Sequence, residues 1–424
     1  MLIEFSVENF MSIKDKITLS MLAGNNEEKE NNVIEYNKNR YLKSASIYGA
    51  NASGKSNIFK AMTAAIVIIR KSSSRQINDK LLEIIPFKFD EESIKKPTKF
   101  QFIFSTNKTK YVYGFSADCN KIHEEYLYQY LSAKPSMIFE RKNTNEYKFT
   151  QTEERELSEI QKKNTDNKLL LATATTWNYG KTKDAYMWFA NEIDTCDDYE
   201  SLPNYALEKF DNNDENLKKF TINLLKEAEI NISNFNIQKE NITNENIRAF
   251  FDDIVVQKIL QSGGNIDGAS RKIFTKHLIK NLNGEVNEYL LNLKEESLGT
   301  QNLFFLSPVL EEAFELGKTI VIDEIDKSLH PLLVRYIIEL FHNPDINKNN
   351  AQLIFNTHDI NLLSLDIFRR DQIYFVEKDY NQGTTELYSL DEFSVRKNEN
   401  IQKGYLQGRY GAIPIIGVGI DLWK

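Results

Sequence analysis

The eight residues Gly49–Ser56 constrain the fold of this chain more than any other segment. Their order fits G-x-x-x-x-G-K-[ST], the spacing of a phosphate-binding loop, which requires a strand before it and a helix after it. The run from Ser44 to Tyr48 suits a buried strand that ends in a tight turn. One helical face after the loop carries apolar residues at helical spacing, namely Ile58, Met62, Ala65, Ile66 and Ile69. The sequence therefore predicts the strand–loop–helix unit of an α/β nucleotide-binding fold.

Each part of this loop has an expected role toward ATP. Gly49 and Gly54, with Asn51, Ala52 and Ser53 between them, let backbone N–H groups close around the β- and γ-phosphates. Lys55 neutralises phosphate oxygens, and Ser56 is the expected ligand of Mg²⁺. Asn57 follows directly and is included among the nucleotide-binding residues. ATP and Mg²⁺ are thus the predicted cofactors.

A second segment supplies carboxylates for hydrolysis. Thr319–Ile322 is an apolar strand followed by Asp323 and Glu324, as in a Walker B segment. We expect Asp323 to hold the Mg²⁺ shell and Glu324 to polarise the attacking water as general base. His358 follows the next apolar strand, where its side chain is expected to reach the γ-phosphate. Together with the phosphate loop, these residues predict an ATPase with Glu324, His358 and Lys55 as its catalytic groups.

The segment from Glu296 to Gln301 precedes a helix that is expected to begin near Leu303. Small residues at a helix N-terminus form an anion site, which suits a γ-phosphate presented from outside the chain. The same residues also suit a plain helix cap, so both interpretations remain open.

The rest of the chain indicates three parts. Alternating residues in 1–21 predict a two-stranded edge, and alternation on both sides of Asn107-Lys108 predicts an antiparallel hairpin. A charged stretch from about Glu153 to Asn281 is interpreted as helical, broken by Pro203 and by an asparagine-rich run. After Ser297, three apolar strands (319–322, 352–355 and 373–376), each expected to be followed by a helix, predict a parallel α/β sheet. The expected domains are 1–150, an inserted helical lobe at 151–290, and 291–424.

The composition of the chain limits the cellular compartments and the kinds of partner that we expect. With 53 Lys+Arg against 61 Asp+Glu, the net charge of -8 gives no overall attraction for nucleic acid, although local lysine clusters leave such a partner open. Cys119 and Cys196 cannot make a disulfide framework, which fits a reducing cytosol. No apolar run reaches membrane-spanning length, and the N-terminus lacks a signal-peptide pattern. We therefore expect a soluble, cytoplasmic protein.

Taken in order, these motifs resemble the ABC-type ATPase heads of the structural-maintenance-of-chromosomes and RecF-like group. Further segments are similar to AAA-labelled ATP-binding proteins of bacterial abortive-infection and anti-phage operons. These segments are Val7-Glu8-Asn9-Phe10-Met11-Ser12, Glu296-Ser297-Leu298-Gly299-Thr300, Asp326-Lys327-Ser328-Leu329-His330-Pro331 and Gly408-Arg409-Tyr410-Gly411-Ala412-Ile413-Pro414. The resemblance covers both ends of the chain and extends only loosely over its middle.

The resemblance implies that Ser297 and Gly299 bind the γ-phosphate of ATP held by a second copy, and that Asp326 lies in the loop coupling the two sites. It therefore implies a head-to-head homodimer enclosing two ATP molecules. The chain departs from the group in its Ser-Leu-Gly-Thr signature, where Ser-Gly-Gly-Gln is common. It also lacks an evident glutamine after the phosphate loop, for which Gln101 is the one candidate.

For such proteins, the resemblance implies a switch that senses infection and regulates a separately encoded toxic effector, often a nuclease. A RecF-like DNA clamp is the alternative, and it predicts DNA binding that weakens steeply with salt. A self-contained nuclease would need an added acidic domain, for which we expect the 66 residues after His358 to be too few. A transporter motor would require a docking partner in the membrane, and the terminal strands resemble the chromosome-associated group instead.

Overall fold

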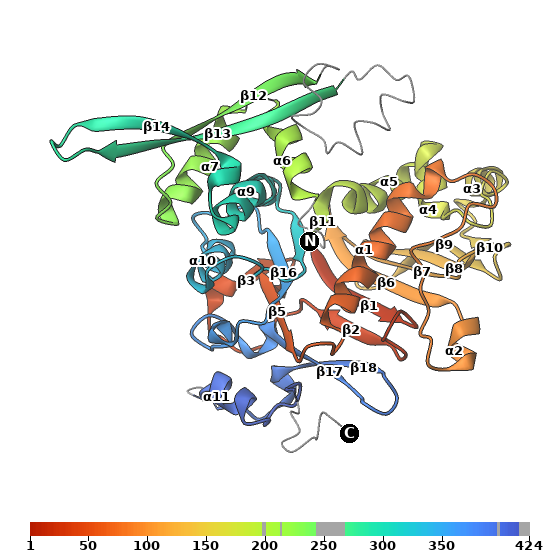
Figure 1. Ribbon diagram of the computed structural model, residues 1–424. Coiled ribbons are helices and arrows are strands. Elements are labelled where there is room, and N and C mark those ends of the chain that lie inside the picture. The colour runs from red at the N-terminus through yellow and green to blue at the C-terminus, as the bar shows by residue number, and fades with distance from the viewer. Residues whose placement is uncertain (197–200, 213, 243–267, 397–398, 415–424) are drawn as a thin grey trace, which may run out of the picture. The chain divides into compact units, whose positions relative to one another are not determined.

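The computed structural model describes residues 1–196, 201–212, 214–242, 268–396 and 399–414. Contacts within the described chain divide it into two compact units. The first consists of Met1–Asp198, Glu312–Lys327 and Pro331–Lys424, and the second of Tyr199–Glu311 and Ser328–His330. Both units are built from strands and helices (Figure 1).

A seven-stranded antiparallel sheet forms one part of the first unit. In spatial order its strands are β10 (Glu146–Phe149), β9 (Ser136–Lys142), β8 (Ile122–Tyr130), β7 (Thr109–Ala117), β6 (Thr98–Thr106), β1 (Leu2–Glu8) and β2 (Ile17–Ser20). The predicted two-stranded edge is confirmed as the β1–β2 pair, and the predicted hairpin as β6–β7. Asn107 and Lys108, at φ 47° and 65°, make its tight turn, because hairpin turns with two positive φ angles match the twist of the strands.

A six-stranded sheet forms the second part of this unit. Its strands, in spatial order, are β11 (Ile193–Cys196), β15 (Thr319–Ile322), β16 (Gln352–Asn356), β5 (Ser44–Gly49), β17 (Ile373–Lys378) and β18 (Thr385–Ser389). All pairs are parallel except β17–β18. The expectation that a helix follows every strand is correct for β15, which precedes α10 (Pro331–His342), and wrong for β17. A tight turn, in which Gly383 N–H donates to Asp379 O at 2.8 Å, returns β17 directly into β18.

Helix α1 (Lys55–Lys71) packs its apolar side into the core against the antiparallel sheet (Figure 1). The predicted helical face is confirmed, because Ile58, Met62, Ala65, Ile66 and Ile69 are all buried. The same core contains side chains of α3 (Glu154–Gln161), α4 (Leu170–Thr176) and the turn after α5 (Gly180–Met187). Trp188 stacks on Phe104 there, with ring centroids 4.2 Å apart. These helices therefore belong to the first unit, although the sequence pattern places them in the inserted lobe.

Gln352 joins the two sheets at their buried junction. Its Nε2 donates to Leu2 O at 3.1 Å and to Leu42 O at 2.9 Å, while Leu2 N–H donates to its Oε1 at 2.7 Å. A buried carboxamide with three such bonds fixes β1 against the start of β16. Smaller elements complete the unit, namely β3 (Val33–Tyr36), β4 (Asn39–Leu42), α2 (Glu91–Lys95) and α11 (Ile401–Leu406).

The second unit contains α6 (Leu202–Phe210), α7 (Glu215–Glu227) and most of α9 (Leu298–Leu316). Pro203 lies in the first turn of α6, where proline is well tolerated, and so begins this helix. The unit also contains a three-stranded antiparallel sheet in the order β12 (Asn234–Ile242), β13 (Gly268–Lys280) and β14 (Val286–Asn292), which the sequence pattern did not indicate. Almost every residue of β14 is exposed, so it lacks the alternation that identifies a half-buried strand. Residues 243–246 of the asparagine-rich run lie outside the described residues.

In the part of the chain that the structure describes, none of the helices combines the length and the apolar character needed to cross a bilayer.

Candidate nucleotide-binding and hydrolysis site

The predicted site residues of the first unit meet at one edge of the six-stranded sheet. The register pairs Gly49 with Val376, Asn356 with Ile47, and Ile322 with Phe355 across parallel neighbours. Since parallel strands end at a common edge, the phosphate loop, Asp323 and the segment around His358 extend from the same side of the sheet. The order of the strands, with β16 between β15 and β5, brings these distant segments together.

The phosphate loop has a backbone that few residues allow. Gly54, immediately before α1, has φ 106°, in the region that favours glycine. A Cβ at Gly54 would collide with Thr385 Oγ1 and lie 2.8 Å from Ser12 Oγ. A Cβ at Gly49 would collide with the carbonyl oxygen of Val376. The two glycines of the motif are therefore both required by close contacts with neighbouring segments.

Three polar side chains from separate elements hold this loop in place. Thr385 Oγ1 donates to Ser53 O at 2.9 Å and shares a hydrogen bond with Ser12 Oγ at 2.7 Å. Asn57 Nδ2 also donates to Ser12 Oγ, at 2.6 Å. The side chain of Asn57 therefore helps to position the loop, and its place among the nucleotide-binding residues stays a prediction. The role of Thr385 was not predicted, because no local sequence pattern marks it as a residue that supports the loop.

The side chain of Lys55 folds back into the phosphate loop that precedes α1. Its Nζ donates to Gly49 O at 2.8 Å and to Ala50 O at 3.1 Å, and the residue is only 6% exposed. Burial lowers the pKa of Lys55, whereas the carboxylates of Asp323, Glu324 and Asp326 act in the opposite direction. The predicted cation and the predicted acids are thus within electrostatic reach of one another.

Asp323 is held by two polar neighbours. Asn356 Nδ2 donates a hydrogen bond to Asp323 Oδ1. Burial raises the pKa of Asp323, while hydrogen bonds from Asn356 and Ser56 act to lower it. The two expected ligands of Mg²⁺, Ser56 and Asp323, are therefore adjacent.

This donor set fits magnesium. A hydroxyl and a carboxylate are the oxygen ligands Mg²⁺ prefers, and it takes few protein ligands when phosphates supply the rest. The described residues show no cluster of three or more His, Cys, Asp or Glu side chains that could hold a metal by themselves. Two buried polar atoms near the loop, Ser53 Oγ and Asp326 Oδ1, have no hydrogen-bond partner among the described residues, as expected where a polar ligand binds.

Asn356 is a residue that the sequence reasoning left without a role. Besides its bond to Asp323, its Oδ1 accepts from Glu324 N–H at 2.8 Å, and its backbone O accepts from Ile325 N–H at 3.2 Å. Glu324 itself has φ 55°, a left-handed conformation that is uncommon outside glycine. Asn356 therefore holds the predicted general base in a strained position, which is frequent at functional sites. The sequence did contain a signal for this role. Asn356 is a polar residue that directly ends an apolar strand, and that strand neighbours the one before Asp323 and Glu324.

His358 and Asp326 connect the loops after β16 and β15. His358 is exposed, and its backbone N–H donates to Asp326 Oδ2 at 3.2 Å. A shift of either loop would therefore be transmitted to the other.

The predicted γ-phosphate segment lies in the second unit, at the start of α9. Ser297 Oγ accepts from Thr300 N–H at 3.1 Å and shares a bond with Thr300 Oγ1 at 2.9 Å. Gln301 Nε2 donates to Glu296 O at 2.8 Å. These bonds fit a helix cap, yet Ser297 and Leu298 face solvent, so the helix end is also open to an outside anion.

Gln101, the candidate for the missing glutamine, lies inside β6. Its Oε1 accepts a hydrogen bond from Tyr126 OH at 2.8 Å. The side chain is thus engaged with the antiparallel sheet.

A phosphate loop between a parallel strand and a helix, with carboxylates at the ends of neighbouring strands, defines the class of P-loop ATPase domains. The chain belongs to the family described as "AAA domain, putative AbiEii toxin, Type IV TA system", whose model matches residues 44–364. This match confirms the expected relation to AAA-labelled ATPases of abortive-infection systems.

Two solved structures are similar to this chain at low identity. The first, "Crystal structure of the SmcHead bound to the C-winged helix domain of ScpA", shares 12% identity and covers 92% of this chain and 97% of that chain, with a TM-score of 0.37. The second, the Smc head domain with an extended coiled coil bound to the C-terminal domain of ScpA, derived from Pyrococcus furiosus, shares 11% identity. It covers 92% of this chain and 96% of that chain, with a TM-score of 0.38. No match was found among curated proteins.

Proposed function

We propose that this chain is an ATP-hydrolysing switch that works as a head-to-head dimer of two copies. The observation that carries the proposal is the open N-terminus of α9, where Ser297 and Leu298 are exposed beside Gly299. Three exposed or half-exposed residues at a helix N-terminus form a site suited to an anion. Their own loop does not supply that anion. The γ-phosphate of ATP held by a second copy is the ligand that the family resemblance implies for this position.

Within one copy, the loop residues bind and orient ATP. Lys55 leaves the carbonyls of Gly49 and Ala50 to neutralise phosphate oxygens, and backbone N–H groups of the loop replace water around them. Magnesium, when held by Ser56 and Asp323, adds positive charge where the phosphates are most negative. Glu324, fixed through its backbone by Asn356, takes a proton from the attacking water.

The second copy completes the site. Ser297 and Gly299 contact the γ-phosphate only when two copies face each other, so ATP shifts the population toward the dimer. Hydrolysis removes that contact and opens the interface that the nucleotide bridges. Asp326, bonded to the His358 loop, couples the state of one site to the other.

The switch is proposed to regulate a separately encoded toxic effector, in keeping with the toxin and toxin–antitoxin terms in the family description. Co-purification of the protein with the products of its neighbouring genes, with and without ATP, tests this part. Neighbours that encode only transport or housekeeping repair proteins would argue against it.

Mixing two inactive variants tests the dimer. Lys55→Ala disables the phosphate loop, and Ser297→Glu places a repelling charge at the signature. In a mixed dimer, the loop of the Ser297→Glu copy meets the intact signature of the Lys55→Ala copy, so one of two sites works. With random exchange, we expect about a quarter of wild-type hydrolysis to return, because half of the dimers are mixed.

The matched control mixes Lys55→Ala with Lys55→Ala/Ser297→Glu, which leaves no intact site in any dimer. Activity that stays at background in both mixtures, while wild type remains active as a monomer in solution, would refute the shared site.

A further inference from the structure

The hairpin of β13 and β14 exposes an unusual amount of apolar surface. Six large apolar side chains near its turn are between 44% and 107% exposed, namely Leu278, Ile279, Leu282, Val286, Tyr289 and Leu290. They fall within 13 consecutive positions of the chain. A contiguous group of exposed apolar residues marks an interaction surface in a stable protein.

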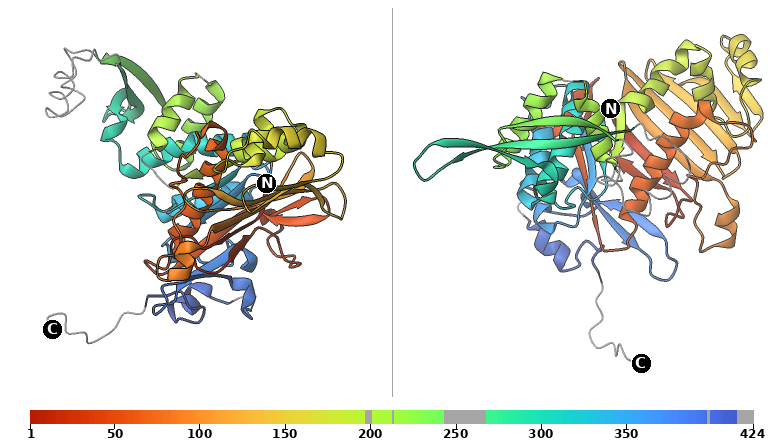
Figure 2. Two further views of the ribbon diagram at one scale, coloured as in Figure 1. Left: turned by 90° about the vertical axis from the view of Figure 1, so that its right-hand side faces the viewer. Right: turned by 45° about the horizontal axis from the view of Figure 1, so that its top comes forward.

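The hairpin tip, defined as residues 277–290, has support on few sides. β12 pairs with β13 only as far as Asn234 opposite Lys276, so residues 277–280 pair with β14 alone. Asn231 Nδ2 donates to Leu278 O at 3.3 Å on the β12 side. The ribbon reaches past α7 and α9 of its own unit, as Figures 1 and 2 show. A two-stranded ribbon of this kind is only marginally stable in water by itself.

The outer edge of β14 lacks the features that usually protect an edge strand. Among the described residues, no strand pairs with it. Its sequence, V-N-E-Y-L-L-N, contains no proline and no lysine, and its pairing with β13 runs without a bulge. Natural edges are commonly blocked by such devices. This edge is therefore suited to receive another strand.

We propose that β14 is the docking edge for a second copy of this chain, with two β14 strands pairing antiparallel about a two-fold axis at Tyr289. A self-complementary patch of this kind is the usual way in which identical chains form dimers. The pairing needs no nucleotide, so it goes beyond the ATP-driven dimer proposed above.

Charge favours this self-pairing. With the axis at Tyr289, Val286 lies opposite Asn292, Asn287 opposite Leu291, and Glu288 opposite Leu290. Glu288 is the one charged residue of β14, and Lys276 of the same copy already pairs with it at 2.8 Å. No like charges therefore oppose each other, and the two tyrosines form an aromatic pair at the axis.

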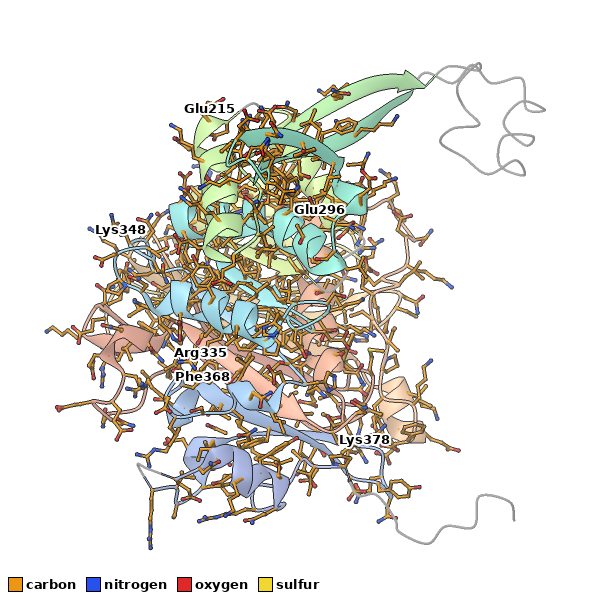
Figure 3. The ribbon with its side chains drawn as sticks, turned by 60° about the vertical axis from the view of Figure 1, so that its left-hand side comes forward. Glu215, Glu296, Arg335, Lys348, Phe368 and Lys378 are labelled. Carbon is orange, nitrogen blue, oxygen red and sulfur yellow. The ribbon has the colours of Figure 1, made fainter. Side chains whose placement is uncertain are left out.

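The hairpin is also bonded to the segment that precedes the signature. Glu296 Oε1 accepts from Thr275 Oγ1 at 2.7 Å and lies 2.8 Å from His277 Nε2. Both partners are on β13, and Glu296, labelled in Figure 3, directly precedes Ser297. Pairing of the hairpins would thus keep two copies together between cycles and hold their signature segments in a defined relation.

Sedimentation of the nucleotide-free full-length protein over a range of concentrations tests the proposal. We expect wild type to form dimers, and Tyr289→Lys to weaken this association by roughly tenfold or more, because two lysines would face each other at the axis. Leu282→Lys is the matched control. It replaces an apolar residue of the turn that is more exposed than Tyr289, at 107% against 51%, and lies outside the paired segment, so it should leave the association unchanged.

A cross-link gives a second, direct measurement. In a Cys119→Ser background, Tyr289→Cys places two thiols opposite each other at roughly 4.5–5.5 Å between Cα atoms, within disulfide range. We expect mild oxidation without ATP to join these copies, and Leu282→Cys to give no dimer. The proposal is overturned if nucleotide-free wild type stays monomeric and Tyr289→Cys fails to cross-link, or if Leu282→Lys weakens association as much as Tyr289→Lys.

One further variant tests the ATP-driven dimer independently of the hairpin pairing. If Glu324→Gln combined with Tyr289→Lys still dimerises with ATP, the shared nucleotide site stands and is independent of the hairpin.

Discussion

Helices α1 and α9 both follow a small residue, Gly54 and Ser297, but their first turns are held in different ways. Before α1, Ser12 and Thr385 bond the loop from outside, and Lys55 folds back onto two carbonyls. Before α9, the hydroxyl bonds of Ser297 stay within its own turn, and Leu298 is 66% exposed.

The difference separates a phosphate loop that distant residues of its own chain hold in place from a helix end that its own chain leaves open. The loop before α1 is fixed by residues distant in sequence, which preorganises it for phosphate. The end of α9 has a satisfied cap and an open face, and its proposed ligand is the γ-phosphate of another copy. The comparison therefore predicts that changes at α1 act on ATP binding and chemistry in each copy, whereas changes at α9 act only through association.

Glu324→Gln should have the largest effect on the α1 side of the comparison. Loss of the general base is expected to slow hydrolysis roughly 10²–10⁴-fold while ATP binding persists, so an ATP-bound dimer accumulates. Single-turnover hydrolysis and light scattering measure the two effects. Glu315→Gln is the control, because this residue is exposed and its hydrogen bond with Asn349 uses the backbone carbonyl rather than the carboxylate. A Glu324→Gln protein that remains monomeric at saturating ATP would contradict the switch.

Lys55→Ala and Ser297→Glu should separate binding from association. Losing the buried cation should weaken ATP binding roughly tenfold to a hundredfold, since hydrogen bonds to charged groups contribute most to such contacts. Ser297→Glu should leave ATP affinity of the monomer unchanged and abolish ATP-dependent dimerisation. Titration with a fluorescent ATP analogue, at protein concentrations below the dimerisation range, measures the affinity. Equal loss of affinity in both variants would remove the distinction between the two helix ends.

Replacing one glycine at each helix end by alanine should show which end is more constrained, as measured by the free energy of unfolding. Gly54→Ala forces a side chain onto φ 106° and against Thr385, so we expect it to lower the free energy of unfolding by about 1–3 kcal/mol. Gly299→Ala should lower it by less, because this glycine is not held at a positive φ and alanine favours the helix. Its Cβ would lie 2.8 Å from the backbone oxygen of Ser328, so that single contact has to shift. Denaturant unfolding measures both, and a larger loss at Gly299 would show that the α9 end is the more constrained.

Asp323→Asn should give the smallest effect, a rise in Tm of roughly 1–3 °C for the nucleotide-free protein at neutral pH. Burial raises the folded-state pKa of Asp323 above its unfolded value, so the ionised carboxylate destabilises the folded chain. This destabilisation is present at neutral pH and disappears as pH falls below the unfolded pKa of about 4, where the carboxyl is protonated in both states. Melting curves at pH 7 and at acid pH test it. If the gain in Tm is as large at acid pH as at pH 7, the ionised carboxylate of Asp323 is not its cause.

Local patterns were enough to predict much of the first unit. The motif at Gly49–Ser56 required β5 and α1, and alternation identified the β6–β7 hairpin. These elements bury one face, so their sequence carries the period of their structure. The order of the parallel strands then placed Asp323 at the edge where the loop lies.

Other parts could not be predicted because their cause is distant in sequence or absent from the local pattern. Thr385 supports the phosphate loop only because β18 turns back beside β17. Strands β12 and β13 fall in the charged stretch that was interpreted as helical, and the almost wholly exposed residues of β14 show no period of two. Asn356 was visible as a polar strand end, but its role depends on the pairing of β16 with β15.

The central place of β5 has a consequence for synthesis on the ribosome. β5 lies between β16 and β17, which come from the other end of the sequence, whereas the strands of the antiparallel sheet all fall within residues 2–149. A growing chain can therefore complete the antiparallel sheet long before β5 gains either neighbour. At ordinary elongation rates, roughly 20–60 s pass between the synthesis of the phosphate loop and that of Thr385. The nascent chain thus lacks the bond from Thr385 that holds the phosphate loop until β18 has been made.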